Sequence, residues 1–198
     1  MKAIVLMGIK HCGKSTQGKL LAKKYNVPFY DTDEIMLKQT GKTPREILTV
    51  LGNDAFLNAE KKACEFISTE IASSKKIQTK EISAVIATGG GICCNSEALA
   101  ILKKFSTFVF LFAEECLASE RIVREAKISS DGTITDLPAY IAKKSPHSIS
   151  EVQAIFHSFY VERYSLYSSL ADITVQVMDS SKKDNLERID SAISVALN

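Results

Sequence analysis

The sequence lacks the features of a secreted, disulfide-stabilised or membrane-spanning protein. It has five cysteines, an odd number, and none of them stands in a C-x-x-C pair. This usage is typical of free thiols in a reducing compartment rather than of a disulfide framework. No apolar run approaches the ~20 residues that span a bilayer, and the amino terminus has neither the basic region nor the apolar run of a secretory signal. We therefore expect a cytoplasmic protein with no membrane partner.

The chain also lacks an excess of one charge, because 25 Lys and Arg residues face 23 Asp and Glu residues, a formal net charge of +2. A nucleic-acid-binding surface gathers basic residues on one face or along one helix. Here the lysine pairs are dispersed, as on solvated helix surfaces: Lys23-Lys24, Lys61-Lys62, Lys103-Lys104, Lys143-Lys144 and Lys182-Lys183. We expect no nucleic-acid partner, and a monomer that binds a small molecule.

The pattern of apolar residues predicts an α/β protein. The chain has 198 residues, the length of one domain or of one domain with an insert. Short apolar runs that read as buried strands occupy residues 3–7, 28–30, 84–87, 107–112 and 173–177. Helical periodicity fills the segments between and after them: 15–25, 56–71, 95–104, 114–125, 149–170 and 186–197. This alternation predicts a parallel sheet covered by helices on both faces, a three-layer α/β/α arrangement.

Punctuating residues refine this outline. Thr43-Pro44-Arg45-Glu46 has the form of a capping box, and Gly52 is placed to end the helix that the box begins. Asn95 can cap the helix that reaches Lys104. The polar stretch from about 127 to 146, with an Asp131-Gly132 turn, breaks the pattern. We expect a single domain over residues 1–198 with a mobile lid or insert at about 127–146.

Residues 8–15 match the phosphate-binding pattern G-x-x-x-x-G-K-[ST] without a gap, between an apolar strand and a helix. Gly8 and Gly13 let the backbone curl so that N–H groups face phosphate oxygens, and the helix N-terminus adds its dipole. Lys14 then places an ammonium on the β- and γ-phosphates, while Ser15 offers a hydroxyl to Mg²⁺. The alternative is a plain glycine turn. We expect ATP and Mg²⁺ as cofactors.

A phosphate loop does not itself identify the acceptor of the phosphoryl group. The base-reading motif N-K-x-D is absent, which disfavours a GTPase switch. Within the loop, we expect the side chains of His11 and Cys12 to point away from the phosphates. Three further segments favour a kinase that acts on a small metabolite.

The first segment is Asp31-Thr32-Asp33, at the end of the second expected strand. Two carboxylates two residues apart on an extended segment project to the same side. One can join the Mg²⁺ shell while the other accepts the proton of an attacking hydroxyl. The alternative is that Asp33 caps a helix beginning at Glu34.

The other two segments are Thr88-Gly89-Gly90-Gly91 and the E-R-x-x-L-Y sequence that contains Arg163. Three glycines after a buried strand admit a ligand close to the backbone, although a tight turn needs one or two glycines as well. Arg163 can clamp a carboxylate or a phosphate, with a surface ion pair as the alternative. We interpret the adjacent Cys93-Cys94 as small apolar filler beside the glycine turn.

In their order, the segments G-x-x-x-x-G-K-S-T, D-T-D, G-G-G and E-R-x-x-L-Y-x-x-x-A-D resemble the shikimate kinase family over nearly the whole chain. The resemblance implies a P-loop NTPase fold with a five-stranded parallel sheet of the nucleoside monophosphate kinase type and a mobile lid. It also implies transfer of the ATP γ-phosphate to the 3-hydroxyl of shikimate.

Carried over by position, the resemblance implies a role for each matching residue. Lys14 and Asp33 would be catalytic, with Asp33 as the base, while Ser15 and Asp31 would hold the metal. The residues implied to bind ATP are Gly8, Gly13, Lys14, Ser15, Thr16 and Arg121, the last packing on adenine. The residues implied to bind the acceptor are Asp33, Gly89, Gly90, Gly91 and Arg163.

Two positions depart from the family pattern. Residues 56–60 read F-L-N-A-E where the family has F-R-x-x-E, so Leu57 replaces an arginine and Glu60 loses its partner. Leu137 replaces the arginine expected over the transferring phosphate, a charge that Arg124 or Lys127 could supply. These departures leave open a same-fold kinase for another small polyol or hydroxy acid, or a nucleotide-binding pseudokinase. The retained D-T-D carboxylates beside an intact phosphate loop favour an enzyme.

Overall fold

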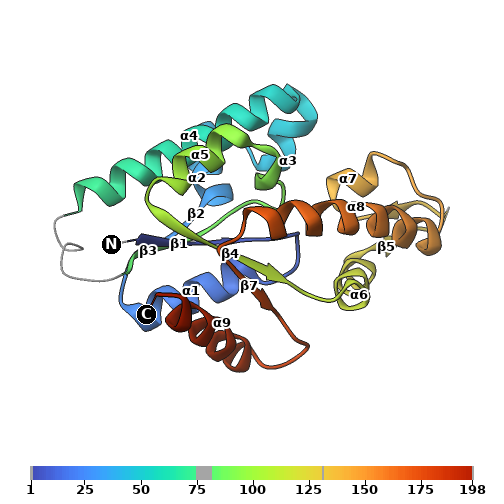
Figure 1. Cartoon of the computed structure of the whole chain (residues 1–198). Helices are drawn as coiled ribbons and strands as arrows, with labels where there is room; N and C mark the ends of the chain where they lie inside the picture. The colour runs from blue at the N-terminus through green and yellow to red at the C-terminus, as the bar shows by residue number, and fades with distance from the viewer. Residues whose placement is uncertain (1, 75–81, 131, 198) are drawn as a thin grey trace.

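A computed structural model describes residues 2–74, 82–130 and 132–197 of the chain. Its centre is a five-stranded sheet with the order β2-β3-β1-β4-β7, in which every pairing is parallel (Figure 1). The strands are β1 (Lys2–Met7), β2 (Phe29–Asp31), β3 (Ile82–Ala87), β4 (Ser106–Phe112) and β7 (Ile173–Gln176). Most of the apolar residues of β1, β3, β4 and β7 are buried, as a sheet covered on both faces requires, while those of the edge strand β2 are partly buried. The predicted five-stranded parallel sheet is confirmed.

Helices cover both faces of this sheet (Figure 1). One face carries α1 (Lys14–Tyr25) and α9 (Lys182–Leu197), which pack on each other. The other face carries α5 (Ser96–Lys103) and α8 (Ile149–Leu170), and α4 (Asn53–Ser73) packs on α5. A further helix, α2 (Thr32–Thr40), packs on α4. The sequence analysis named a helix here only as the alternative, with its start at Glu34, two residues later than observed.

The predicted caps are present. Thr43 Oγ1 accepts a hydrogen bond from Glu46 N, and Glu46 Oε2 accepts one from Thr43 N, so a capping box begins α3 (Pro44–Glu46). A π-helical turn, η1 (Ile47–Leu51), follows and ends at Gly52, whose φ of 88° favours glycine. The Asn95 side chain caps α5 by accepting a hydrogen bond from Ala98 N at 3.2 Å.

The 127–146 segment holds a pair of short strands that its polar sequence did not predict, followed by a short helix within residues 137–143, where the sequence does allow one. The two-residue strands β5 (Lys127–Ile128) and β6 (Ile134–Thr135) pair as an antiparallel hairpin, and α7 (Ala139–Ala142) follows. Strands this short carry no readable alternation, which is why the sequence did not predict them. Of the predicted turn, Gly132 donates its N–H to the Ser129 carbonyl, while Asp131 lies outside the described residues.

In Figure 1 this segment extends from the sheet region beside α6 (Glu115–Glu125) and α8. The Tyr140 ring of α7 stacks on the Phe159 ring of α8, with centroids 3.6 Å apart. Burial of Tyr140 raises the pKa of its hydroxyl. Leu137 is 1% exposed and packs into the core, so an apolar residue there is explained by packing.

Among the described residues, no helix combines the length and the apolar character that crossing a bilayer requires.

Candidate active site

The loop of residues 8–15 joins β1 to α1 with the backbone geometry that its motif predicts. Gly8 (φ 145°) and Gly13 (φ 85°) both take positive φ values, which glycine adopts without steric cost. A Cβ on Gly8 would also collide with the carbonyl oxygen of Leu111 on β4. The loop is therefore pressed against the sheet, and residue 8 must be glycine.

Lys14 and Ser15 lie at the start of α1. Lys14 is 8% exposed, and its Nζ donates to the Ile9 carbonyl at 2.9 Å across the loop. Ser15 Oγ donates to Asp31 Oδ2 at 2.7 Å. A hydroxyl and a carboxylate at one place are hard oxygen donors of the type that Mg²⁺ prefers. Mg²⁺ usually takes one or two protein ligands beside phosphates and water, so this pair fits the ion.

Asp31 and Asp33 do not share an extended segment, which corrects the sequence prediction. The helix α2 begins at Thr32, and Asp31 is its cap, because Asp31 Oδ1 accepts from Asp33 N at 3.0 Å and Glu34 N at 3.4 Å. The first N–H groups of a helix have no partner within the helix, and a carboxylate before it supplies one. Asp33 lies in the first turn of α2 and is not the cap.

The Asp33 carboxylate lies beside the glycine loop, which we define as residues 88–91 after β3. Its Oδ1 is buried and has no hydrogen-bond partner in the described part of the chain, and a Cβ on Gly89 would be 2.9 Å from it. Burial raises the pKa of Asp33 and the neighbouring Asp31 charge raises it further, while Lys14 and Lys10 lower it. The carboxylate thus lies against Gly89 and within electrostatic range of both lysines.

The glycine loop contacts both the D-T-D segment and the phosphate loop. Thr32 Oγ1 accepts a hydrogen bond from Gly89 N at 3.0 Å, a role for the central residue of D-T-D that the sequence analysis missed. A Cβ on Gly90 would be 3.0 Å from Lys10 N of the phosphate loop, whereas the space around Gly91 is open. Gly90 therefore allows the glycine loop to lie directly against the phosphate loop, and Gly89 allows the carboxylates of Asp33 and Glu60 to lie close to its backbone.

Arg163 reaches the glycine loop from α8. Its Nη1 lies 2.9 Å from Cys93 Sγ and 3.4 Å from the Gly91 carbonyl oxygen, and its guanidinium lies 4.8 Å from the centroid of the Phe159 ring. Its Nε is buried without a hydrogen-bond partner among the described residues. Cys93 thus contacts Arg163 and also packs against the core, whereas Cys94 is exposed, which corrects the interpretation of Cys94 as apolar filler. Burial raises the pKa of the Cys93 thiol.

Glu60 of α4 joins this group, although the sequence analysis gave it no role of its own. It is fully buried, and its Oε2 accepts a hydrogen bond from Asn95 Nδ2 at 3.0 Å. Its Oε1 has no partner among the described residues. Burial raises the pKa of Glu60 to about 7, the Asn95 hydrogen bond and the charge of Arg163 lower it, and the charge of Asp33 raises it. The available signal was a charged residue on the apolar face of a helix.

The remaining candidates lie around the phosphate loop. Arg121 of α6 donates from Nη1 to the His11 carbonyl at 3.0 Å, which places it beside the loop. The His11 ring lies 3.3 Å from Glu125 Oε1, and burial lowers the pKa of His11. Cys12 is 1% exposed, whereas Thr16 is exposed at the start of α1.

The two residues considered as substitutes for the missing arginine of the 127–146 segment differ in their pairing. Lys127 Nζ forms an ion pair with Asp136 Oδ2 at 2.8 Å, at the surface of that segment. Arg124 is exposed near the end of α6. Leu137 itself is apolar and buried, so it supplies no charge to the site.

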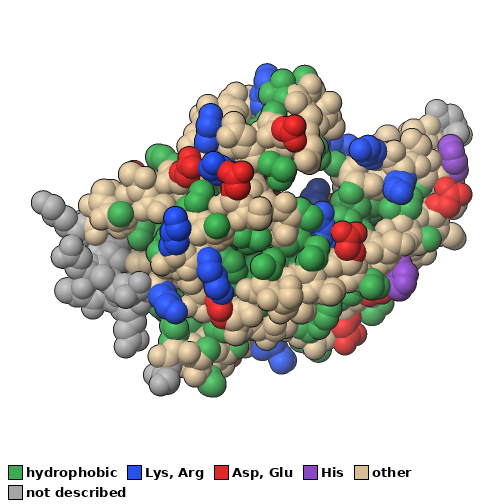
Figure 2. All heavy atoms as spheres, turned by 45° about the horizontal axis from the view of Figure 1, so that its top comes forward, with side chains coloured by type: hydrophobic (Ala, Val, Ile, Leu, Met, Phe, Trp, Pro, Cys, Tyr) green, Lys and Arg blue, Asp and Glu red, His purple; other side chains and the backbone are tan. Residues whose placement is uncertain are grey.

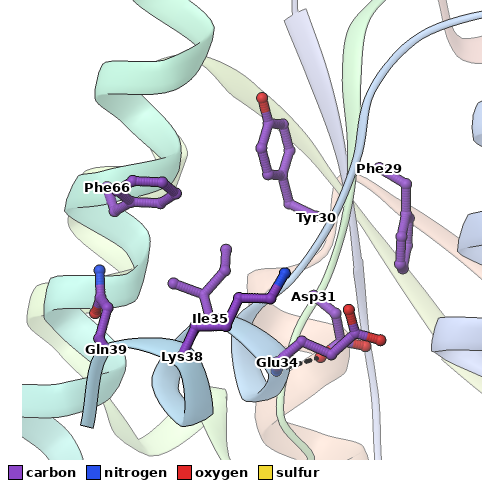
Figure 3. Close-up of a pocket in the computed structure, with 8 residues that line it drawn as sticks. All are labelled: Phe29, Tyr30, Asp31, Glu34, Ile35, Lys38, Gln39 and Phe66. Carbon is purple, nitrogen blue, oxygen red and sulfur yellow. Dashed lines mark hydrogen bonds between the residues drawn. The ribbon is translucent and has the colours of Figure 1, made fainter.

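A pocket of about 370 Å³ lies beside this site, between β2, α2 and α4 (Figure 3). Tyr30, Ile35 and Phe66 line it, and Asp31 is the one candidate site residue in its wall. Among the described residues, none of the phosphate loop lines this pocket, which is therefore distinct from the space over that loop. Figure 2 shows a hollow in the surface with Lys or Arg side chains on its floor and wall. Cationic side chains in a hollow favour an anionic ligand.

A glycine-rich loop and lysine at a helix N-terminus, on a parallel sheet of this order, define a P-loop protein of the nucleoside monophosphate kinase type. The family model for shikimate kinase matches residues 10–194. The chain belongs to the shikimate kinase family.

Relatives of known name agree with this assignment. A shikimate kinase of Caldicellulosiruptor bescii is 36% identical over 57% of this chain, and the match spans 59% of that protein. One of Francisella tularensis subsp. holarctica is 27% identical over 96% of this chain and 93% of its own length. The structure of Acinetobacter baumannii shikimate kinase in complex with shikimate superimposes with a TM-score of 0.73, at 21% identity over 98% of this chain and 94% of that one. That structural likeness supports the fold.

Proposed function

We propose that the protein catalyses the ATP-dependent phosphorylation of a hydroxyl group of shikimate, giving shikimate 3-phosphate, with Mg²⁺ as the metal. The observation that carries this proposal is the position of Asp33. Its unpartnered Oδ1 lies against Gly89, and its charge interacts with Lys14 and Lys10 of the phosphate loop. A group in this position can hold an acceptor hydroxyl next to a bound γ-phosphate.

Each residue then has a defined task. Asp33 accepts the proton of the attacking hydroxyl, and Lys14 stabilises the charge that develops on the phosphoryl oxygens. Ser15 and Asp31 supply the protein oxygens for the metal. Arg163, with its unpartnered Nε, pairs with the carboxylate of the acceptor. When bound, ATP and Mg²⁺ supply the phosphoryl group and part of the charge neutralisation.

The nucleotide and the 127–146 segment belong to the same proposal. Gly8, Gly13 and Thr16 line the phosphates, and Arg121, which is fixed beside the loop through the His11 carbonyl, packs on adenine. The 127–146 segment acts as a lid that excludes water from the transferring phosphate. Gly90 and Gly91 contact the acceptor through the backbone.

The proposal is tested by the release of ADP from Mg-ATP by the purified protein, with shikimate varied over a wide concentration range. We expect turnover that depends on shikimate and saturates with it, and a product that carries phosphate on the 3-hydroxyl. Nucleotide that binds without any stimulation by shikimate would contradict the proposal.

Replacing Gly89 by alanine should lower kcat/KM for shikimate on the order of 10²-fold, because misplacing a reacting group by about 1 Å has effects of that size. The new Cβ would lie 2.9 Å from Asp33 Oδ1 and 3.2 Å from Glu60 Oε1, so both carboxylates must shift. Gly91→Ala is the matched control, because a Cβ there meets open space. Steady-state kinetics and thermal melts of both variants make the comparison, and equal losses at the two positions would count against this packing argument.

A further inference from the structure

Two buried carboxylate oxygens lie over the backbone of Gly89 without a hydrogen-bond partner among the described residues. They are Asp33 Oδ1 and Glu60 Oε1, and a Cβ on Gly89 would be 2.9 and 3.2 Å from them, respectively. The two side chains come from different helices, α2 and α4, and meet around one small volume. Buried acceptors are nearly always paired, so two orphaned acceptors at one place indicate where the donors of a ligand belong.

The orientation of Glu60 is fixed by its other oxygen. Asn95 Nδ2 donates to Glu60 Oε2 at 3.0 Å and to the Leu57 carbonyl at 2.9 Å. The Asn95 side-chain oxygen is itself held by Ala98 N at the start of α5. The cap of one helix thus holds the carboxylate of another, and it leaves Oε1 as the oxygen directed toward Gly89.

The charged and titratable groups around Glu60 leave this oxygen available to a ligand. They are Asp33 on α2, Arg163 on α8 and the buried Cys64 thiol on α4 itself. Arg163 is the one cation among them, and its Nη1 is directed to the Gly91 carbonyl and Cys93 Sγ. One turn earlier on α4, position 57 holds a leucine and supplies no second cation.

We propose that Glu60 binds the acceptor directly, with Oε1 accepting a hydrogen bond from the hydroxyl on the carbon next to the phosphorylated one. Asp33 holds the reacting hydroxyl, so the two carboxylates together select small molecules that carry hydroxyls on adjacent carbons. Each hydroxyl has one proton to donate, and Asp33 Oδ1 and Glu60 Oε1 are buried acceptors without a partner among the described residues. This inference rests on the proposed function and makes Glu60 a specificity-determining residue of the same site.

The test removes the hydroxyl from the acceptor. We would measure kcat/KM for shikimate, 4-deoxyshikimate and 5-deoxyshikimate at roughly pH 8.5, above the pKa of about 7 that burial gives Glu60. The proteins are the wild type, Glu60→Gln and Glu65→Gln, the last an exposed site on the same helix. In the wild type and Glu65→Gln, loss of the 4-hydroxyl should lower kcat/KM by about tenfold or more, the typical effect of a hydrogen bond to a charged group. In Glu60→Gln the same loss should be about threefold or less, since coupled contacts are not additive.

The outcomes separate the two proposals. Shikimate turnover with the same 4-deoxy loss in the wild type and Glu60→Gln overturns the role of Glu60 and leaves the proposed function in place. Absence of shikimate turnover in the wild type overturns the proposed function and this inference with it. Should Glu60→Gln not fold, the wild type decides alone: the 4-deoxy loss must exceed the 5-deoxy loss by about tenfold, and equal losses overturn the contact.

Discussion

Replacing Lys14 by alanine should lower ATP turnover with shikimate by about 10²–10³-fold, the effect of removing one preorganised charge that stabilises a transition state. Lys14 Nζ already folds over the phosphate loop, where it donates to the Ile9 carbonyl at 2.9 Å. A bound γ-phosphate would draw the Lys14 ammonium away from the Ile9 carbonyl and toward the phosphate oxygens. Without the ammonium, the backbone N–H groups of the loop still bind phosphate, so turnover should fall further than nucleotide binding.

The fold should survive this substitution. Alanine is the best helix former, and the wild-type side chain contributes one hydrogen bond, a net of about 0.5–1.5 kcal/mol. Lys19→Ala is the matched control on the same helix, because Lys19 is exposed and forms a surface ion pair with Glu34 at 3.1 Å. Such a pair is worth about 0–1 kcal/mol, so this variant should keep its activity.

The measurement is steady-state ADP release by the three proteins, with circular dichroism and thermal melts as tests of folding. Normal turnover in a folded Lys14→Ala protein would overturn the assignment of residues 8–15 as the catalytic phosphate loop. A loss of equal size in Lys19→Ala would point to damage to α1 rather than to the missing charge.

Local sequence signals were enough to predict the scaffold of this protein. Apolar runs with little alternation mark strands buried on both faces, and β1, β3 and β4 carry them, whereas the edge strand β7 alternates buried and less buried residues. The capping box at Thr43 and the cap at Asn95 involve residues within a few positions of each other, so their chemistry is readable from the sequence. The phosphate loop is also local, because its glycines and lysine act within one turn of chain.

The sequence predicted most of the residues of the candidate site, but it did not predict how they are arranged in space. Asp33 was placed on an extended segment because period-2 reasoning was continued two residues past the end of β2, although Asp31 already caps α2. The importance of Glu60 and Cys93 depends on contacts between residues far apart in the sequence. Glu60 contacts Asn95, and Cys93 contacts Arg163. No pattern within α4 reveals that Glu60 Oε1 meets Asp33 over Gly89, since that meeting depends on how α2 and α4 pack.

Replacing Leu57 by arginine should lower the KM for shikimate by about 10–100-fold. Positions 57 and 60 are neighbours on one face of α4, so the introduced guanidinium can reach Glu60 Oε1, which has no partner among the described residues and has lone pairs for both a guanidinium and an acceptor hydroxyl. It can also join Arg163 at the acceptor carboxylate, and a bidentate, charge-assisted pair contributes a few kcal/mol when it is shielded from water. The backbone contact at this position is kept, because Asn95 Nδ2 binds the carbonyl of residue 57 rather than its side chain.

Two comparisons show whether such a gain comes from the carboxylate. Leu57→Lys adds the charge without the planar fork and should give a smaller gain. The primary amide of shikimate, which has no negative charge, should bind the Leu57→Arg protein and the wild type about equally well. An unchanged or higher KM for shikimate in a folded Leu57→Arg protein would mean that the pocket around residue 57 has no room for a second guanidinium. The wild type would then bind the carboxylate of the acceptor through Arg163 alone and its hydroxyls through Asp33 and Glu60. Recognition would depend less on the acceptor carboxylate and more on its hydroxyl groups.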